Sequence, residues 1–474
     1  MVKEKYNIKQ AKNENNFQRS PRSKIGIGTS YTFTGANMSP FGGIFAAGCF
    51  AQQMGLDKLL ADSITTERKT EVSASQYILS VIYLLYIGYE RFAHVQYVKD
   101  DAIFQRIVDI ERMPVQSSFW RFFNKSLGQQ NEEQLRGVIF EMQRRVWVAS
   151  NVGLRRIHID TDTTVETVYG EQEKACVGYN PGHRGKKSYQ PVISTIAETG
   201  EFICGRQRSG DTISGEEIAA HLDQVFTHLP PNVEYVISRM DSGFYCKEAV
   251  EKHEQYGIHY TIAVKKHAPV QQEIAKVKWK KSKLSDGVAE FWYQPGSWKK
   301  PHRFIVARYR KENKEEQTDM FEDISYKYRV FVTDLRRKAH KIVIEYDGRA
   351  NIESLIEESK NQIAMAKIPG KSFAANAVFM QAVMLAFNLN KWLQLIGRPE
   401  GEPFHWEEIR TSRFKHLYIA SRIVETGRKT IIRFAEDYPY KEYFNRLIQR
   451  LRRIVYKEGA LQSVIKTNLV PGFS

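Results

Sequence analysis

The sequence predicts a mixed α/β protein in which a central sheet lies between helical N- and C-terminal regions. Apolar residues follow a helical period from about residue 56 to residue 148 and again beyond Pro369, whereas they alternate as in strands from Arg155 onward. In this central part, strands and helices follow the order β-β-β-α-β-α-β, which predicts a mixed sheet. A basic, aromatic segment interrupts the order before the last helix and indicates a late insertion.

The N-terminal part is expected to comprise a flexible basic tail, 1–35, and a helical DNA-binding region, 36–150. Within that region, a helix near 102–110 and another near 116–127 flank a short break at Met113–Pro114, which is the spacing of a helix-turn-helix. An ordinary helical hairpin has the same pattern. Both interpretations therefore stay open.

Three strands are expected at the start of the first part of the core, 151–270. The segment Ile157–Val165 alternates in polarity and is rich in β-branched residues, as strands are. Two further runs, Gln190–Ala197 and Phe202–Arg208, are separated by a short turn and predict a hairpin.

The remaining core elements alternate between helices and strands, and a second part of the core, 328–370, follows the insertion at 271–327. A Ser-x-x-Glu capping box at Ser214 starts the first of these helices. In chain order the expected elements are a helix over Ser214–Leu229, a strand over Val233–Met240, a helix over Lys247–Tyr256, strands over Ile258–Val264 and Tyr328–Thr333, and a helix over Asn351–Lys367. A helical C-terminal region, 371–474, is expected to serve DNA binding or dimerisation.

Composition and charge exclude several classes of protein. The chain has 70 Lys and Arg against 54 Asp and Glu, a net charge of +16, which favours a polyanionic partner, either nucleic acid or an acidic membrane surface. Its four cysteines form no C-x-x-C pair, which argues against a structural zinc site and a disulfide scaffold. The N-terminus has no apolar segment typical of a secretory signal, so we expect a cytoplasmic protein. The apolar segment Phe373–Ile396 contains several amide side chains and a lysine, and is expected to be a buried helix instead of a membrane span.

Three acidic residues are candidates for a metal site. Asp162 lies on the first predicted strand, Asp241 follows the end of a later one, and Glu353 lies on the helix after the insertion. Carboxylates from separate elements can hold two Mg²⁺ ions about 3.5–4 Å apart, one activating a water or 3′-hydroxyl and the other stabilising the leaving oxygen of a phosphodiester. Mg²⁺ prefers such hard oxygen ligands.

The helix that carries Glu353 shows a second pattern. Tyr346, Arg349, Glu353 and Lys360 are spaced by 3, 4 and 7 residues. At ~100° per residue they fall within an arc of roughly 60°, provided that the helix begins near Tyr346. We therefore expect one polar stripe beside the apolar one, although Gly348 could delay the start of the helix.

These motifs together resemble a known family. The four spaced residues match the Y-x2-R-x3-E-x6-K pattern of bacterial insertion-sequence transposases with an RNase H-like DDE core. The run Ile159–Thr164 resembles the strand of the family's first aspartate, and Arg239–Phe244 resembles its second-aspartate motif. Between them, Val168–Glu173, Gly178–Pro181 and Arg184–Lys186 resemble the insertion-sequence family numbered thirteen-eighty.

The resemblance implies an α/β RNase H-like mixed-sheet catalytic core with a β-rich insertion. It implies a cut-and-paste transposase that binds the terminal inverted repeats of its element as double-stranded DNA, pairs them as a homodimer, cleaves with water and joins the 3′-hydroxyls to target DNA, near the nucleoid of a bacterial cell. By position, Asp162, Asp241 and Glu353 would hold two Mg²⁺ ions, for which Mn²⁺ could substitute. Arg349 and Lys360 would grip phosphates near the scissile bond, and Tyr346 would order the flanking DNA.

Each of these assignments has an alternative. Asp160 and Asp162 face the same side of one strand, so either could be the first ligand; the two threonines after Asp162 favour it. Asp241 could be a turn-forming aspartate before Ser-Gly. Glu357 and Glu358 compete with Glu353, which the spacing favours. Arg184 and Lys186 could contact DNA or lie in a solvated loop.

The insertion is basic and aromatic. From Lys276 to Lys311 there are 11 Lys or Arg against two acids, interleaved with aromatic residues. Basic groups for phosphates and aromatic faces for unpaired bases are typical of a site that distorts DNA strands. In related transposases an insertion-domain tryptophan stacks on a flipped base, and Trp292 or Trp298 would fill that role here, unless both are core residues.

The placement of charge separates DNA from a membrane. The segment 154–270 has 13 Lys or Arg and 16 acids, whereas 3–24, the insertion and 410–457 are strongly basic. Basic regions around an acidic centre favour DNA held on its phosphates over a metal site. The leading hypothesis is a DNA transposase; the alternatives are an RNase H-like Mg²⁺-dependent nuclease and a non-catalytic, transposase-derived DNA-binding protein.

Overall fold

The computed structural model describes residues 25–27, 29–67, 70–213, 215–282, 284–310, 326–427 and 429–455. The chain divides into two units, Met1–Ala36 and Asn37–Ser474. Residues 1–24 and 28 of the predicted flexible tail lie outside the described residues, and 25–27 and 29–36 contain no helix or strand. The fold described below is that of the second unit.

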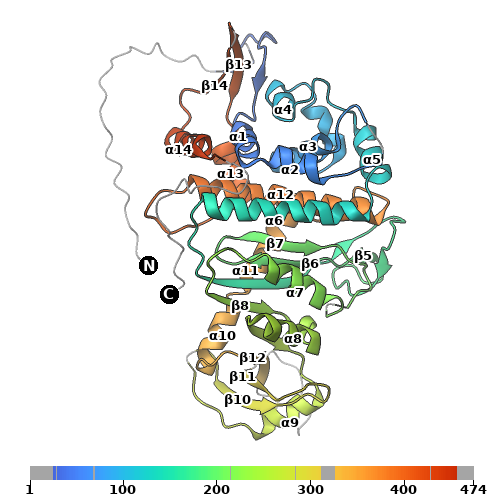
Figure 1. Cartoon of the computed structure of the whole chain (residues 1–474), viewed down its shortest axis with the longest axis vertical. Helices are drawn as coiled ribbons and strands as arrows, with labels where there is room; N and C mark the ends of the chain where they lie inside the picture. Colours follow the sequence, from blue (N-terminus) through green and yellow to red (C-terminus); the bar gives the residue numbers. More distant parts are fainter. Residues whose placement is uncertain are drawn as a thin grey trace. The chain divides into compact units, whose positions relative to one another are not determined.

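An eight-stranded mixed sheet forms the centre of this unit, in the order β10-β11-β12-β9-β8-β2-β6-β7 (Figure 1). Strand β2 pairs antiparallel with β6 and parallel with β8, while β6–β7 is antiparallel and β8–β9 parallel. Five of the eight strands come from residues 151–270: β2 (Arg156–Thr163), β6 (Val192–Ile196), β7 (Glu201–Arg206), β8 (Tyr235–Met240) and β9 (His259–Val264). The predicted mixed α/β class and these five strands are confirmed.

The segment predicted to be an insertion extends the same sheet. It contributes β10 (Gly287–Tyr293) and β11 (His302–Arg310), and β12 (Tyr326–Thr333) joins them to β9. All three pairings are antiparallel. Residues 283 and 311–325 of the predicted insertion lie outside the described residues.

Helices flank the sheet strands along the chain. They are α7 (Ile218–Thr227), α8 (Lys247–Tyr256), α9 (Ala268–Lys276), α10 (Ala339–Asp347) and α11 (Ala350–Gln362). The predicted start of the first helix was wrong: Ser214 lies outside the described residues, and the helix begins only after Glu217, whose φ of 57° is left-handed and interrupts helical propagation. A small sheet, β3-β5-β4, follows β2 and is made of β3 (Glu166–Thr167), β4 (Cys176–Val177) and β5 (Lys187–Tyr189).

The N-terminal region is helical, as predicted. Its elements are α1 (Ile44–Met54), α2 (Leu56–Ser63), α3 (Ala74–Tyr86), the 3-10 helix η1 (Phe92–Tyr97), α4 (Ala102–Ile107), α5 (Gln116–Lys125) and α6 (Gln129–Ala149). Asp101 caps α4 by accepting hydrogen bonds from two backbone amides, at 3.0 and 2.9 Å. Helices α4 and α5 occupy the positions predicted for a helix-turn-helix or a helical hairpin.

Helix α12 (Phe373–Gly397) is long and apolar enough to cross a membrane, but 94% of its most apolar window is buried inside the protein. It runs beside α6 along the edge strand β7 (Figure 1). The amide of Asn388 both accepts from and donates to the backbone of Phe202, at 2.8 Å each, and Gln381 donates to the carbonyl of Gly205 at 2.9 Å. The polar residues of α12 therefore satisfy the open edge of the sheet.

The predicted all-helical C-terminal region was wrong. After α13 (Ile409–Ser412) and the π-helix η3 (Arg413–Leu417), the chain forms the hairpin β13 (Ser421–Thr426) and β14 (Lys429–Phe434) before α14 (Lys441–Arg453). The runs 423–424 and 431–432 are β-branched, and Gly427 supplies the positive φ of 61° at the turn. Strand β1 (Met38–Ser39) pairs with β13 and completes a three-stranded sheet.

Candidate active site

Two of the candidate acids lie at the C-terminal ends of neighbouring strands. Strands β2 and β8 are parallel neighbours, with Asp160 opposite Arg239 and Thr161 opposite Met240, so Asp162 and Asp241 lie at adjacent strand ends. The Oδ1 atom of Asp162 accepts a hydrogen bond from the amide of Thr163 at 2.8 Å, and that of Asp241 from the amide of Gly243 at 2.7 Å. Local backbone contacts therefore hold one oxygen of each carboxylate.

The third acid, Glu353, comes from the corner between α10 and α11. The expected single stripe was wrong, because Tyr346 lies in the last turn of α10 and Arg349 is the N-cap residue of α11. Gly348 separates the two helices, and a Cβ atom there would lie 2.6 Å from Nη1 of Arg239. The absence of a side chain at Gly348 therefore leaves room for the guanidinium of Arg239.

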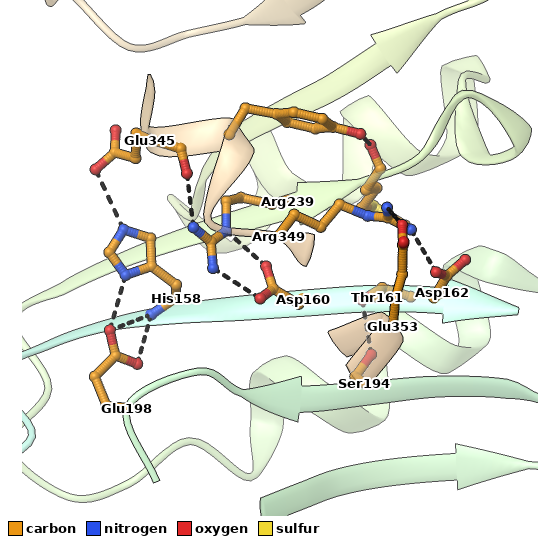
Figure 2. A network of polar contacts seen from close by, with 12 residues as sticks. His158, Asp160, Thr161, Asp162, Ser194, Glu198, Arg239, Glu345, Arg349 and Glu353 are labelled. Atoms are coloured by element: carbon orange, nitrogen blue, oxygen red, sulfur yellow. Dashed lines mark hydrogen bonds and ion pairs between the residues drawn. The ribbon is translucent and has the colours of Figure 1, made fainter. Parts of the chain in front are cut away.

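Arg349 connects two of the acids (Figure 2). Its Nη2 lies 2.6 Å from Oδ2 of Asp162, and its Nη1 donates to Oε1 of Glu353 at 3.2 Å. Burial lowers the pKa of Arg349, but the carboxylates of Asp162 and Asp241 outweigh it and leave this pKa above its ordinary value. The side chain of Glu353 is 66% exposed, whereas that of Asp162 is 14% exposed.

The acids repel one another across the site. Burial raises the pKa of Asp162 to about 6; the charges of Asp241 and Glu353 act in the same direction, and Arg349 opposes them. The three carboxylates are therefore within electrostatic reach of one another. Such a concentration of negative charge at a sheet edge favours binding of cations.

Asp160 has a different environment from Asp162. It is fully buried, and its two oxygens accept from Nε and Nη2 of Arg239 at 2.6 and 2.7 Å (Figure 2). Of the two aspartates on β2, only Asp162 combines partial exposure with a position beside Asp241 and Glu353.

The residue types fit a divalent metal. Asp162, Asp241 and Glu353 offer only carboxylate oxygens, which suit Mg²⁺ or Mn²⁺. Over the described residues, no three His, Cys, Asp or Glu side chains stand close enough together to hold an ion as they are placed. A guanidinium lies between Asp162 and Glu353, so the arrangement accommodates positive charge at that point.

Lys360 lies near the same strand end, together with an acid that the sequence patterns did not single out. Its ammonium donates to the carbonyl of Val165 at 3.0 Å; burial lowers its pKa, and Glu166 and Asp162 oppose that shift. Glu166 is buried, accepts from Gln207 at 2.8 Å, and burial raises its pKa to about 7. The signal in the sequence that could have identified Glu166 is its position four residues after Asp162.

Tyr346 is buried in this structure. Its hydroxyl donates to the carbonyl of Met240 at 3.0 Å, and its ring lies 4.5 Å from that of Phe331. The side chain thus ties α10 to the last residue before Asp241.

In the described part of the chain, the other predicted DNA-binding residues make no hydrogen bond or ion pair with Asp162, Asp241 or Glu353. Arg184 and Lys186 are exposed in the loop between β4 and β5. Trp292 on β10 is 69% exposed, whereas Trp298 is 8% exposed and packs against Tyr245 and His302. Trp298 is therefore a core residue in this structure.

Comparison with known proteins gives a family match over most of the chain. The model described as "Transposase DDE domain group 1" matches residues 27–456. Among solved structures, a piggyBac transposase synaptic complex with hairpin DNA is similar over 86% of this chain and 81% of that chain, at 9% identity and a TM-score of 0.40. A Mos1 transposase paired-end complex with the left transposon end is similar over 36% and 57%, at 13% identity and a TM-score of 0.17. No curated protein matches the sequence.

Proposed function

The chain belongs to the transposase DDE domain group 1 family, and on this premise we propose that it is a cut-and-paste DNA transposase. It would cleave the phosphodiester bonds at the terminal inverted repeats of an insertion sequence and join the 3′ ends to target DNA. One observation carries the proposal: Asp162 and Asp241 lie at adjacent ends of two parallel strands, and Arg349 links Asp162 to Glu353 of α11.

We propose further that the core is RNase H-like. The order β7-β6-β2-β8-β9, with three antiparallel strands followed by two parallel ones, supports this fold. The Y-x2-R-x3-E-x6-K pattern and the runs between Val168 and Lys186 support a place near the insertion-sequence family numbered thirteen-eighty, and hence action at the bacterial nucleoid.

In this proposal, Asp162, Asp241 and Glu353 would hold two Mg²⁺ ions, or Mn²⁺ in their place. Bound metal would supply the activation of a water or 3′-hydroxyl and the neutralisation of the leaving oxygen. Arg349 and Lys360 are the cations beside the acids, and we assign both to phosphate oxygens near the scissile bond: a guanidinium can bind two oxygens at once, and an ammonium acts as a point charge. Tyr346 would order the flanking DNA indirectly, through its contact with Met240.

The insertion region offers a path for the DNA backbone. A groove of about 690 Å³ lies between α9, β10 and the start of α10. Five lysines line it, against the two acids Glu273 and Glu290: Lys276, Lys278, Lys280, Lys281 and Lys338. We propose that this groove binds phosphates of double-stranded DNA, and that the exposed Trp292 stacks on an unpaired base. Arg184 and Lys186, exposed beside β5, would contact the same duplex.

The proposal includes a homodimer that pairs two transposon ends. The two alternative functions predict different products. A nuclease would nick end DNA without joining it, and a non-catalytic DNA-binding protein would shift the mobility of the DNA without changing it.

The test incubates the protein with Mg²⁺, a duplex carrying the inverted repeats that flank its gene, and a plasmid target. We expect joined product from the wild type and none from Asp241→Asn, with DNA binding retained. Asp223→Asn is the matched control, since Asp223 lies on α7 and pairs with Lys252 at 2.8 Å. Cleavage without joining favours the nuclease, and equal activity of Asp241→Asn and the wild type contradicts the site.

A further inference from the structure

Arg239 is a buried cation at the centre of the core, and each nitrogen of its guanidinium has a defined partner. Nε and Nη2 bind the two oxygens of Asp160 on β2, at 2.6 and 2.7 Å. Nη1 donates to the backbone carbonyl of Glu345 in the last turn of α10, at 2.6 Å. One side chain of β8 therefore connects the neighbouring strand to a helix end (Figure 2).

The contact with α10 is a C-terminal cap. The last carbonyls of a helix have no partner within the helix, and a positive charge there is favourable. Gly348 follows directly, and any Cβ at this position would lie 2.6 Å from Nη1 of Arg239. The glycine is thus the residue that lets the guanidinium reach the corner between α10 and α11.

A second group of charged residues contacts the same turn of α10, through the side chain of Glu345. The Oε1 atom of Glu345 contacts Nε2 of His158 at 3.2 Å and Nη1 of Arg337 at 2.8 Å, and it also pairs with Arg156. His158 in turn contacts Glu198 through Nδ1 at 2.8 Å. Because His158 and Arg156 lie on β2, the last turn of α10 is fixed to both β2 and β8.

Each member of this arrangement lies close in sequence to an acid of the candidate active site. Asp160 precedes Asp162 by two residues on β2, and Arg239 on β8 precedes Asp241, which directly follows that strand, by two residues. The corner capped by Arg239 leads directly into Arg349 and α11, which carries Glu353. A change in the Asp160–Arg239 pair would shift all three carboxylates relative to one another.

We propose that Asp160, Arg239 and Gly348 are positioning residues, which set the separation of Asp162, Asp241 and Glu353. This inference rests on the proposed function. A buried ion pair adds little stability over well-packed apolar residues, so the geometry that it imposes is its main contribution here. A displacement of about 1 Å at reacting groups costs on the order of 100-fold in rate.

The test compares Asp160→Asn, Arg239→Gln, the double variant and Gly348→Ala in the full chain. Glu132→Gln is the matched control, because Glu132 and Arg136 form an equally buried ion pair, 3.0 Å long, between residues of α6. Circular dichroism and denaturant unfolding establish that each variant is folded. The readouts are kcat and KM for cleavage of end duplex, and Mn²⁺ binding to the protein–duplex complex, counted by electron paramagnetic resonance.

We expect about a 100-fold loss of kcat in the single variants, a KM within threefold of the wild type, and at least tenfold weaker Mn²⁺ binding. The double variant should lose no more than the worse single variant, because both residues act through one contact. Glu132→Gln should keep both values even if it unfolds more easily. Gly348→Ala removes neither charge, so it tests the geometry if a charge variant fails to fold.

The inference is overturned if folded Asp160→Asn or Gly348→Ala keeps the kcat and Mn²⁺ affinity of the control. It is also overturned if the wild type and Asp241→Asn bind the same amount of Mn²⁺, since the acids would then hold no metal whose binding could depend on their separation. A wild type that binds Mn²⁺ through Asp241 without cleaving end duplex would contradict only the proposed function, and the Mn²⁺ comparison would still decide the positioning role.

Discussion

Strands β2 and β8 share a buried ion pair between Asp160 and Arg239, whereas the segment from Lys276 to Trp292, at the far edge of the same sheet, exposes most of its charged residues. In the first region, both carboxylate oxygens of Asp160 accept hydrogen bonds from the guanidinium of Arg239. In the second, lysines line an open groove and Trp292 faces solvent. One sheet thus has a part with a buried ion pair and a part whose lysines are exposed to solvent.

In the proposed function, the two regions meet different requirements. Reacting groups must be held within a few tenths of an ångström, which buried, fully paired charges achieve. A DNA backbone is long, regular and hydrated, and exposed lysines can follow it without fixed geometry.

If Glu353 is a metal ligand, as proposed, Glu353→Gln should abolish cleavage of end DNA, with a loss of roughly 10³-fold or more, because the bound metal would contribute several kcal/mol to the transition state. Glu357→Gln, an equally exposed position one turn along α11, should stay within about twofold of the wild type. Single-turnover cleavage of a labelled duplex measures both. Equal losses in the two variants would contradict the assignment of Glu353.

Trp298→Ala and Trp292→Ala should differ in stability. The first empties a buried site and should lower the free energy of unfolding by about 3–5 kcal/mol. The second removes an exposed side chain and should change it by less than about 0.5 kcal/mol. Urea unfolding measures both values. If Trp292→Ala proves the more destabilising, the contrast between a buried Trp298 and an exposed Trp292 is wrong.

Glu166→Gln should change how stability depends on pH. The folded state raises the pKa of Glu166 from an ordinary value of about 4.3 to about 7, so it favours the protonated carboxyl. The stabilising contribution is complete below about pH 4.3 and is lost as the pH rises through about 7. Between pH 5 and pH 8 the wild type should therefore lose about 2 kcal/mol more stability than Glu166→Gln. Unfolding curves at both pH values test this, and parallel pH profiles would refute it.

Lys278→Ala and Lys338→Ala should each weaken DNA binding several-fold at physiological salt. Each should also reduce the slope of log K against log salt by about 1, because one phosphate contact is lost. Lys299→Ala is the control: Lys299 lies in the same region, outside the groove, and pairs with Glu251 at 2.9 Å. Fluorescence anisotropy over a salt series measures the slopes. An unchanged slope in both groove variants would remove the groove from the DNA path.

Local patterns predicted most of the elements near the site. The alternation at Ile157–Val165, the strand ending at Asp241 and the helix Lys247–Tyr256 all appear in the structure with small shifts at their ends. The hairpin β13–β14 was missed, although the β-branched runs at 423–424 and 431–432 and Gly427 at the turn between them are local signals for it. The sequence showed that Gly348 could interrupt the helix, but not that the side chain of Arg239, on another element, lies against this glycine.

Residue patterns along the chain were sufficient to predict the mixed α/β class, the helical N-terminal region, the candidate acids Asp162, Asp241 and Glu353, and the clustering of basic residues away from the core. These follow from residue type and from periods of two or about 3.6, which are local properties of the chain. Three features became visible only in three dimensions: the pairing of Asp160 with Arg239, the position of Arg349 between two acids, and the burial of Trp298 but not of Trp292. Ion pairing and burial depend on distances between elements far apart in the chain, and no local period records them.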